Sequence, residues 1–368
     1  MLNSLLKLWQ RLLPPPASFG PPPAPVHPAV QGHYTLPANS ADLPAGLRPL
    51  FAAPYRLAPV HVFCLRDVYF TAVGVVFKNL HVFGPSLPDQ RVARLLNRSF
   101  LLKQFVRMPG VHHTTQPRLV LAHDQWSQNY YHWMIDLLPR LLLLPDELRH
   151  LPLVLPSFEA GHLLPTLRAL GFHNFYRLRD NEIVFAEELL LPERTAVGAF
   201  QNPGLLRQVQ QRLVQALSPA AGPPTRRIYA SRARATKRRL LNEPALEELL
   251  RGLGFEIIAF EDMDFTAQVQ LMRETQLFVG VHGANLVNTL FMQPGSTVVE
   301  IMNTQLINLV YYRMASALGL PYYFVPAESA RPPAAADSTG FDADQNDADV
   351  RVDAVAVAAL LHRLLAGA

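Results

Sequence analysis

The sequence contains a single cysteine, Cys64, so an internal disulfide and a multi-cysteine zinc site are excluded. It also lacks the roughly 18 to 20 uninterrupted apolar residues that a membrane-spanning helix needs. Charge of one sign is barely in excess, because 33 Lys and Arg face 29 Asp and Glu, a net charge of +4. That excess is too small to indicate a nucleic-acid-binding protein. These absences predict a protein of a reducing compartment, the cytoplasm.

A chain of 368 residues with 49% hydrophobic content has enough apolar surface for about two domains. Residues 1–13 combine leucines with Lys7 and Arg11, a pattern that suits a helix packed on protein or one lying on a membrane surface. Peripheral contact with the inner face of the membrane and a homo-oligomer are therefore both left open. The expected parts are a terminal helix with a Pro-rich extension (1–60), an α/β acceptor domain (61–217), a Rossmann-like donor domain (226–328), an acidic, mobile Ala/Pro-rich loop (329–353) and a final helix (354–368).

The predicted fold class is α/β in both domains. In the second domain five strands alternate with four helices, which predicts a doubly wound, mainly parallel sheet. Its strands are expected at 227–231, 255–260, 277–281, 297–301 and 322–325, with Asn242 and Asp264 capping two of the helices. The first domain is expected to begin with strands at 61–64 and 68–77 and to continue, from residue 119, with strands alternating with helices.

The turn after strand 277–281 has the features of a ligand-binding site. It consists of His282, Gly283, Ala284 and Asn285. The small residues let backbone N–H groups approach a ligand, and helix N-termini at the carboxyl edge of such a sheet bind anions, diphosphates especially. A tight turn capped by His282 is the alternative. Asn288, on the same short helix, adds a further polar group and favours ligand binding.

Seven cations lie within residues 226–239, which overlap and follow the first strand of this domain. A nucleic-acid patch would interleave aromatic side chains for base stacking, and Tyr229 alone is aromatic here. Arg232 follows the carboxyl end of strand 227–231, the edge at which His282 lies, so we expect it to face a diphosphate. The other cations are interpreted as surface residues.

The first domain has its own polar signal in a helix predicted over 129–143, bent near Pro139. His132, Asp136 and Arg140 are spaced by four and share one helical face. A carboxylate one turn from an imidazole orients the ring and fixes its tautomer, which suits a general base. The same spacing is typical of solvent-facing ion pairs worth only about 0.2 to 0.5 kcal/mol each. Spacing does not separate the two interpretations.

Three segments in this order and separation resemble family 61 glycosyltransferases: NYYHWMIDLLPRL, RIYASRARATKRRLLNE and LFVGVHGANLVNTLFMQPGSTVVEI. That family includes bacterial capsular-polysaccharide enzymes, plant xylosyl- and arabinosyltransferases and animal enzymes that attach N-acetylglucosamine to protein. The resemblance covers about residues 119–323. It implies a GT-B architecture, two Rossmann-like domains with a nucleotide-sugar donor in the cleft, and inversion at the anomeric carbon.

The resemblance also implies roles for the residues found above. Arg232 and the turn from His282 to Asn285 would bind the donor diphosphate, while His132 or Asp136 would take the proton from an acceptor hydroxyl. Glu300, near the end of strand 297–301, is predicted to accept hydrogen bonds from the donor ribose, the alternative being a buried structural acid. Further candidates are Asp124, Glu243, Gln268 and Asn288. The acceptor is expected to be a glycan, lipid-linked glycan or protein, in surface-polysaccharide biosynthesis.

Three other functions are left open. Residues 262–264, Asp-Met-Asp, match the manganese-binding D-x-D signature of other glycosyltransferases, although Asp264 has a use as a helix cap. His123, His132 and Asp136 together would suit a metal hydrolase, and a non-catalytic carbohydrate-binding module is the third alternative. The expectation remains a transferase that uses no cofactor and no metal, with a divalent ion left open.

Overall fold

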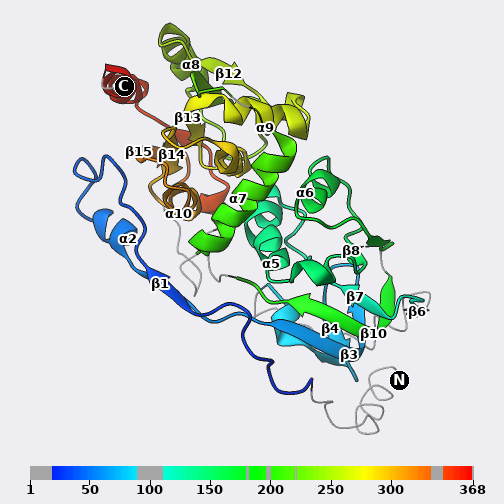
Figure 1. The fold of residues 1–368 in the computed structure, drawn as a ribbon. Helices are drawn as coiled ribbons and strands as arrows, with labels where there is room; N and C mark the ends of the chain where they lie inside the picture. The colour runs from blue at the N-terminus through cyan, green and yellow to red at the C-terminus, as the bar shows by residue number, and fades with distance from the viewer. Residues whose placement is uncertain are drawn as a thin grey trace, which may run out of the picture. The chain divides into compact units, whose positions relative to one another are not determined.

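The computed structural model describes residues 19–88, 111–179, 182–195, 200–218, 220, 222–332 and 343–366. The helix predicted over residues 1–13 lies outside these residues. Within the described ranges, no helix is both long enough and apolar enough to cross a membrane. The chain divides into two compact units: unit 1 contains residues 1–30 and 57–197, and unit 2 contains residues 31–56 and 198–368 (Figure 1).

Unit 1 is built on one mixed sheet in the order β5-β4-β3-β10-β7-β8-β9, with β6 also paired to β10. The β5-β4-β3-β10 part is antiparallel, whereas β6, β7, β8 and β9 run parallel to their neighbours. The strands are β3 (Val62–Thr71), β4 (Val76–Lys78), β5 (His81–Val82), β6 (Val111–His113), β7 (Arg118–Val120), β8 (Leu153–Leu155), β9 (Phe175–Arg177) and β10 (Ile183–Pro192). β1 (Val30–Gly32) and β2 (Tyr55–Leu57) form a separate two-stranded sheet.

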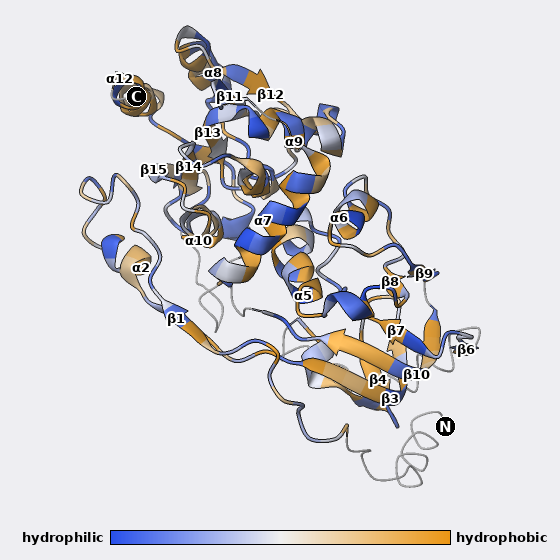
Figure 2. Cartoon of the chain, in the orientation of Figure 1, coloured by the Kyte–Doolittle hydropathy of each residue, from blue (hydrophilic) through white to orange (hydrophobic). Residues whose placement is uncertain are grey.

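The two long strands β3 and β10 form the hydrophobic centre of unit 1 (Figure 2). Buried residues at alternate positions, such as Val68 and Phe70, face a core shared with β7, as the two-residue period of a strand requires. The strand predicted over 68–77 is not continuous. It turns at residues 72–75, where Gly74 has φ +78°, a left-handed conformation that favours glycine. The chain then returns as β4.

The helix predicted over 129–143 exists, but its first half is a π-helix. η2 (His132–Leu137) is followed by α5 (Leu138–Leu141), and the Leu138 N–H donates to the Trp133 carbonyl five residues earlier. Pro139 has no N–H to donate to Ile135, so an ordinary α-helical ladder cannot continue there. Among the described residues of unit 1, the remaining helices are η1 (Gly84–Ser86), η3 (Asp146–Leu148) and α6 (Leu163–Ala169).

The predicted parallel sheet of the second half is present in unit 2. Its order is β12-β11-β13-β14-β15-β16, parallel except for β16. The strands are β11 (Arg226–Ala230), β12 (Glu256–Ile258), β13 (Thr275–Val281), β14 (Thr297–Asn303), β15 (Tyr322–Ser329) and β16 (Val350–Arg351). Numbered from β11, the parallel part reads 2-1-3-4-5, one of the common doubly wound orders.

Helices cover both faces of this sheet (Figure 1). Val279 and Val281 of β13 face a core closed by α8 and α12. Gly280, between them, faces the other way and lies against Leu286 of η5. On that second side α7 contacts α9, η5 and α10. The helices of unit 2 are α2 (Arg48–Ala52), α7 (Pro203–Leu217), α8 (Glu243–Gly252), η4 (Phe260–Asp262), α9 (Phe265–Arg273), η5 (Ala284–Phe291), α10 (Val310–Ala317), α11 (Ala343–Asn346) and α12 (Ala354–Ala366).

One of the two predicted helix caps is confirmed. Asp264 accepts the Ala267 N–H at 2.8 Å and caps α9. Asn242 precedes α8 but its side chain does not cap that helix. It instead donates to the Val352 carbonyl at 2.7 Å and accepts the Val352 N–H. A side chain with two distant backbone partners leaves the helix N-terminus to other groups.

Two segments lie elsewhere than the sequence predicted. Residues 31–56, expected in the extension, pack in unit 2, where Ala38 N–H donates to the Tyr322 carbonyl at 2.8 Å. α7, expected at the end of the first domain, also belongs to unit 2. Part of the predicted mobile loop is ordered, because β16 pairs with β15 and Ala348 and Val350 are buried. Residues 333–342 of that loop lie outside the described ranges.

Candidate functional site

The order of the strands in unit 2 places two loops at the topological switch point of the sheet, where the strand order reverses. β11 lies between β12 and β13, and the loops after β11 and β13 leave the same carboxyl edge. Ligands of open α/β sheets bind outside the carboxyl ends of strands at such a switch point. The loop after β11 contains Arg232, and the turn after β13 contains His282. The structure therefore brings together the two residues that the sequence placed at one edge.

Arg232 is fixed against the glycine of the HGAN turn. Its backbone N–H donates to Glu243 at 2.5 Å, and its guanidinium donates to the carbonyl oxygens of Lys237 and Arg238 at 2.5 and 3.3 Å. A Cβ built on Gly283 would lie 2.9 Å from Arg232 Nη1, so only glycine allows this close approach. Burial and the neighbouring Arg238 charge lower the pKa of Arg232.

Glu243 lies beneath this loop and does not face outward. It is buried, and one carboxylate oxygen accepts from both the Arg232 N–H and the Tyr229 hydroxyl, the latter at 2.9 Å. Burial and the Glu243 charge raise the pKa of Tyr229 well above its ordinary value, which keeps that hydroxyl protonated as a donor. Glu243 therefore positions Arg232.

Glu300 is not at the surface of the donor edge, as the ribose prediction required. It is 0% exposed. One carboxylate oxygen accepts from His282 Nδ1 at 2.5 Å and the other from the Tyr322 hydroxyl at 2.7 Å. Strand β14 points Glu300 into the sheet interior, where these partners occupy it. Because a carboxylate accepts hydrogen bonds, Nδ1 bears the proton and Nε2 of His282 is the nitrogen available to a ligand.

The other predicted residues of this edge are divided between internal support and the turn itself. Gln268 donates to the Phe260 and Met263 carbonyls at 3.0 and 3.1 Å and accepts from Asn288 at 3.1 Å. These two amides connect α9 to η5. Asn285 is different, because its Nδ2 is buried and has no hydrogen-bond partner. η5, which begins at Ala284, is a 3₁₀ helix of eight residues.

The D-x-D segment does not present a pair of carboxylates. Asp262 forms an ion pair with Arg234, while Asp264 caps α9. Across the described ranges, no three His, Cys, Asp or Glu side chains are grouped so that they could hold a metal ion. The two carboxylates of residues 262–264 are thus committed to separate partners.

In unit 1 the predicted general-base pair is formed. His132 Nδ1 lies 2.6 Å from Asp136 Oδ2, so the proton on Nδ1 faces the carboxylate and Nε2 remains as an acceptor. The side chains of His132 and Asp136 are 28% and 18% exposed. The ring centre of Trp126, which is itself exposed, lies 5.1 Å from that of His132. A partly exposed imidazole oriented by a carboxylate is suited to proton transfer.

Arg140 does not extend the His132 column. It is buried and donates to the Pro192 carbonyl at 2.9 and 3.0 Å and to Asp124 at 3.2 Å. Arg194 takes the expected place: it pairs with Asp136 at 3.2 Å and also with Asp124. These contacts form a series of side chains of alternating charge. It leads from Arg140 through Asp124, Arg194 and Asp136 to His132. The π-helix and Pro139 change the helical register that the prediction assumed.

Arg194 was missed by the sequence analysis, although a signal existed. It follows the buried strand β10, which runs parallel to β7, and Asp124 follows β7. The carboxyl ends of parallel strands meet at one edge of a sheet. Its guanidinium carbon also lies 5.2 Å from the ring centre of Trp126.

Asp124 is a poor alternative base. Burial opposes its charged form, but the Arg140 and Arg194 guanidiniums outweigh burial and hold the pKa of Asp124 below its usual range. His123 does not join His132 and Asp136 in a metal site. It is buried, its two ring nitrogens lie 3.2 and 3.0 Å from the Val154 and Ala72 carbonyl oxygens, and burial lowers its pKa.

A parallel α/β sheet with a partly buried arginine and a glycine turn at its switch point is the arrangement of nucleotide-binding α/β proteins. Comparison with protein families narrows this class. The family Glycosyltransferase 61 matches residues 130–299, a range that includes the His132 pair, Arg232 and the HGAN turn. This match, over less than half of the chain, agrees with the resemblance to family 61 glycosyltransferases found in the sequence.

The curated relatives that match this chain are named as sugar transferases. Protein O-linked-mannose beta-1,4-N-acetylglucosaminyltransferase 2 of Canis lupus familiaris is 29% identical over 281 residues, 74% of this chain and 42% of the relative. The human protein of that name is 28% identical with the same coverage. EGF domain-specific O-linked N-acetylglucosamine transferase of Drosophila melanogaster is 31% identical over 33% of this chain and 24% of its own length. The chain thus spans less than half the length of the relatives it matches.

Proposed function

We propose that this chain is an inverting, metal-independent glycosyltransferase that moves a sugar from a nucleoside-diphosphate donor to a hydroxyl of a glycan acceptor. The observation that carries the proposal is the approach of the Arg232 guanidinium to Gly283 at the switch point of the unit 2 sheet. A fixed cation beside backbone N–H groups is suited to a diphosphate leaving group. The family match over residues 130–299 and the names of the relatives support sugar transfer.

The proposal includes the GT-B architecture implied by the resemblance. Its support is that each unit has its own sheet with parallel strands, and that each sheet has polar residues after its carboxyl ends. One unit would then bind the donor through Arg232 and His282, and the other would supply the base.

In the proposed transfer step, side chains of this chain act as the base and stabilise the leaving group. His132 Nε2 takes the proton of the acceptor hydroxyl, and the oxygen forms a bond to the anomeric carbon as the bond to the diphosphate breaks. The electron pair leaves on the diphosphate, whose charge Arg232 stabilises. Glu300 and Glu243 act as positioning residues, since the first orients His282 and the second fixes the Arg232 backbone. Attack from the face opposite the leaving group inverts the configuration.

The acceptor class is proposed from two directions. The resemblance to capsular enzymes suggests surface polysaccharide, whereas the relatives are named for O-linked mannose and EGF domains. N-acetylglucosamine, which both names contain, is the first sugar to test. The three alternatives have less support: the carboxylates of residues 262–264 have separate partners, His123 lies apart from the hydrolase set, and a binding module would not need the Asp136-held imidazole.

The deciding experiment measures release of nucleoside diphosphate from a panel of UDP- and GDP-sugars, including UDP-N-acetylglucosamine, with mannosides and capsular oligosaccharides as acceptors. We expect turnover that EDTA does not reduce, and a product whose anomeric configuration, read by NMR, is opposite to that of the donor. Loss of turnover with EDTA and recovery with manganese would instead support residues 262–264 as a metal site. Donor binding without turnover on any acceptor would favour the binding module.

A further inference from the structure

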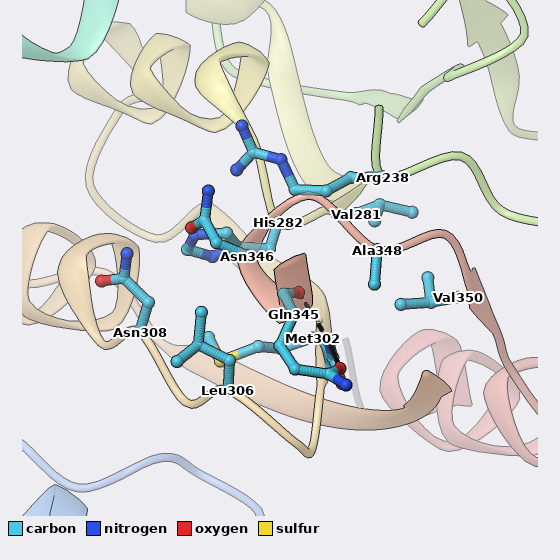
Figure 3. Close-up of a pocket in the computed structure, with 11 residues that line it drawn as sticks. Arg238, Val281, His282, Met302, Leu306, Asn308, Gln345, Asn346, Ala348 and Val350 are labelled. Carbon is cyan, nitrogen blue, oxygen red and sulfur yellow. Dashed lines mark hydrogen bonds between the residues drawn. The ribbon is translucent and has the colours of Figure 1, made fainter. Parts of the chain in front are cut away.

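Beside His282 lies a pocket that involves an arginine the sequence analysis interpreted as a surface residue. The pocket is lined by residues from four parts of unit 2: the end of β13 with the turn after it, the loop after β11, residues 302–308 at and after the end of β14, and residues 345–350. Figure 3 shows Arg238, Asn346, His282 and Asn308 with their polar ends on one side of it and apolar side chains behind them. A cation and two amides able to donate hydrogen bonds, those of Asn308 and Asn346, are thus gathered beside His282, where an anionic ligand is expected.

The charge of Arg238 is not neutralised in the way its neighbours' charges are. Lys237 pairs with Asp347 at 2.5 Å, and Arg239 pairs with Asp349 at 2.7 Å. None of the salt bridges formed by the described residues includes the Arg238 guanidinium, and its Nε is buried without a hydrogen-bond partner. An unsatisfied buried donor is costly, so this position favours a ligand that accepts hydrogen bonds.

The backbone of Arg238 is held in an unusual conformation. Its φ is +54°, in the left-handed region where a side chain carries strain that a fold retains mainly at functional positions. Residues 345–350 maintain this conformation, because the Arg238 N–H donates to the Asp347 carbonyl at 3.3 Å and the Val350 N–H donates to the Arg239 carbonyl at 2.9 Å. These two backbone hydrogen bonds therefore hold the loop after β11 against residues 345–350 at Arg238 and at the residue that follows it.

Arg238 also lies close to the proposed diphosphate ligand Arg232. The Arg232 guanidinium donates to the carbonyl oxygens of Lys237 and Arg238, and burial together with the Arg238 charge lowers the pKa of Arg232. Two cations that repel each other in a partly buried place are stabilised by an anion bound to both.

We propose that Arg238 is a second phosphate-binding residue of the donor site, and that residues 345–350 position it. The inference rests on the proposed function, because it identifies the ligand as the diphosphate of the donor.

The test is calorimetric titration of the full chain with inorganic pyrophosphate and with UDP, because pyrophosphate reports the phosphate contacts alone. Arg238→Gly suits the left-handed φ, so its Tm should equal or exceed that of the wild type. Its Kd for both ligands should rise by about ten- to a hundred-fold, the usual range for a lost charge-assisted hydrogen bond. Arg238→Lys keeps the charge but not the bidentate geometry, so its Kd should lie between those of the wild type and Arg238→Gly.

Arg239→Ala is the matched control, because it removes a neighbouring cation that Asp349 already neutralises, and its Kd should stay within about two-fold of the wild type. A folded Arg238→Gly or Arg238→Lys protein with wild-type Kd overturns the inference, while sugar turnover by the wild type would leave the proposed function standing. Failure of the wild type to bind either ligand overturns both. Binding that depends on Arg238 in a protein without turnover supports the phosphate site and counts against the proposed reaction.

Discussion

The His282 imidazole is held by side chains from the two strands that follow it. Glu300 of β14 accepts a hydrogen bond from its Nδ1, and Tyr322 of β15 donates a hydrogen bond to the other carboxylate oxygen of Glu300. Removing one partner of such a buried set would leave a charge unpaired, at a cost of about 3 to 5 kcal/mol. Glu300 therefore acts through His282. Because His282 and Tyr322 occupy its carboxylate, Glu300 does not reach the surface at which the donor ribose was predicted to bind.

The His132 pair supports a prediction about turnover. His132→Ala removes the base and Asp136→Asn weakens its orientation, so kcat should fall by about 10² to 10⁴. Binding of UDP should not change, because neither residue is proposed to contact the donor phosphates. Steady-state kinetics and calorimetric titration of the same preparations separate the two effects.

His150→Ala is the control for this prediction, because His150 belongs to the same unit and its ring is exposed. It should leave kcat unchanged. If the His132→Ala and Asp136→Asn proteins are folded and nearly fully active, the pair is a surface ion pair and the base is another residue.

Gly283 supports a prediction that separates binding from stability. In Gly283→Ala the new Cβ would lie 2.9 Å from Arg232 Nη1. The guanidinium must then move aside and give up its hydrogen bonds to the Lys237 and Arg238 carbonyl oxygens, which water can replace because Arg232 is only partly buried. We expect a stability change below about 1 kcal/mol and a Kd for UDP raised by about ten-fold, since Arg232 loses its position. Thermal unfolding and calorimetry measure both.

Gly252→Ala is the matched control, because nothing lies within 4 Å of the added Cβ. It should bind UDP as the wild type does. Wild-type affinity in a folded Gly283→Ala protein would place the phosphates away from Arg232.

At the scale of elements, the turn between β3 and β4 packs closely against the backbone of His123. Gly74 has φ +78°, and an added Cβ would lie 2.1 Å from the His123 carbonyl oxygen, a backbone atom that cannot move aside. Gly74→Ala therefore combines left-handed strain with overpacking, and we expect a loss of about 2 to 5 kcal/mol in the free energy of unfolding. Denaturant titration measures it.

Gly161→Ala provides the comparison, because the added Cβ has open space and the φ of Gly161 is not in the left-handed region. Its midpoint should match or slightly exceed that of the wild type. Equal stability of the Gly74→Ala protein would mean that the β3–β4 turn relaxes away from His123.

The π-helix is the element that alters the first site most. η2 places His132 and Asp136 together but turns Arg140 toward Asp124 and the end of β10. π-turns are rare and occur often at functional sites. Here η2 ends at Leu137, two residues before Pro139, so the residue that interrupts the α-helical ladder also determines which arginine faces Asp136.

For the whole molecule, a partly buried histidine predicts how stability depends on pH. Burial lowers the pKa of His162 from 6.5 to about 4. As pH falls below 6.5 the unfolded chain binds a proton that the folded chain refuses until about pH 4. Stability should thus be complete above pH 6.5 and fall by about 1 to 3 kcal/mol toward pH 4. Tm measured across this range checks the slope.

His162→Phe keeps a ring against Tyr130 and Trp133 but removes the titration, so its Tm should fall less steeply between pH 6.5 and 4. His150→Phe, at an exposed ring, should follow the wild type. Parallel slopes for His162→Phe and the wild type would assign the acid limb to other groups, His123 first.

The sequence determined the features that depend on local periodicity and strand order. Alternating strands and helices predicted the parallel sheet of unit 2, and the position of Arg232 and His282 after two such strands predicted their common edge. Both follow because each strand is a short apolar run followed by turn residues, and because parallel strands end at one edge. The i,i+4 spacing likewise brought His132 to Asp136.

Only the tertiary structure decided which side chains face the ligand. Glu300 turned inward because β15 supplies Tyr322 as a partner. Arg194 replaced Arg140 because β10 ends beside β7. Arg238 faces the pocket because residues more than 100 positions later form backbone hydrogen bonds with Arg238 and Arg239. Spacing along the chain contains no information about such partners, since strand pairing and burial bring together residues that are distant in sequence.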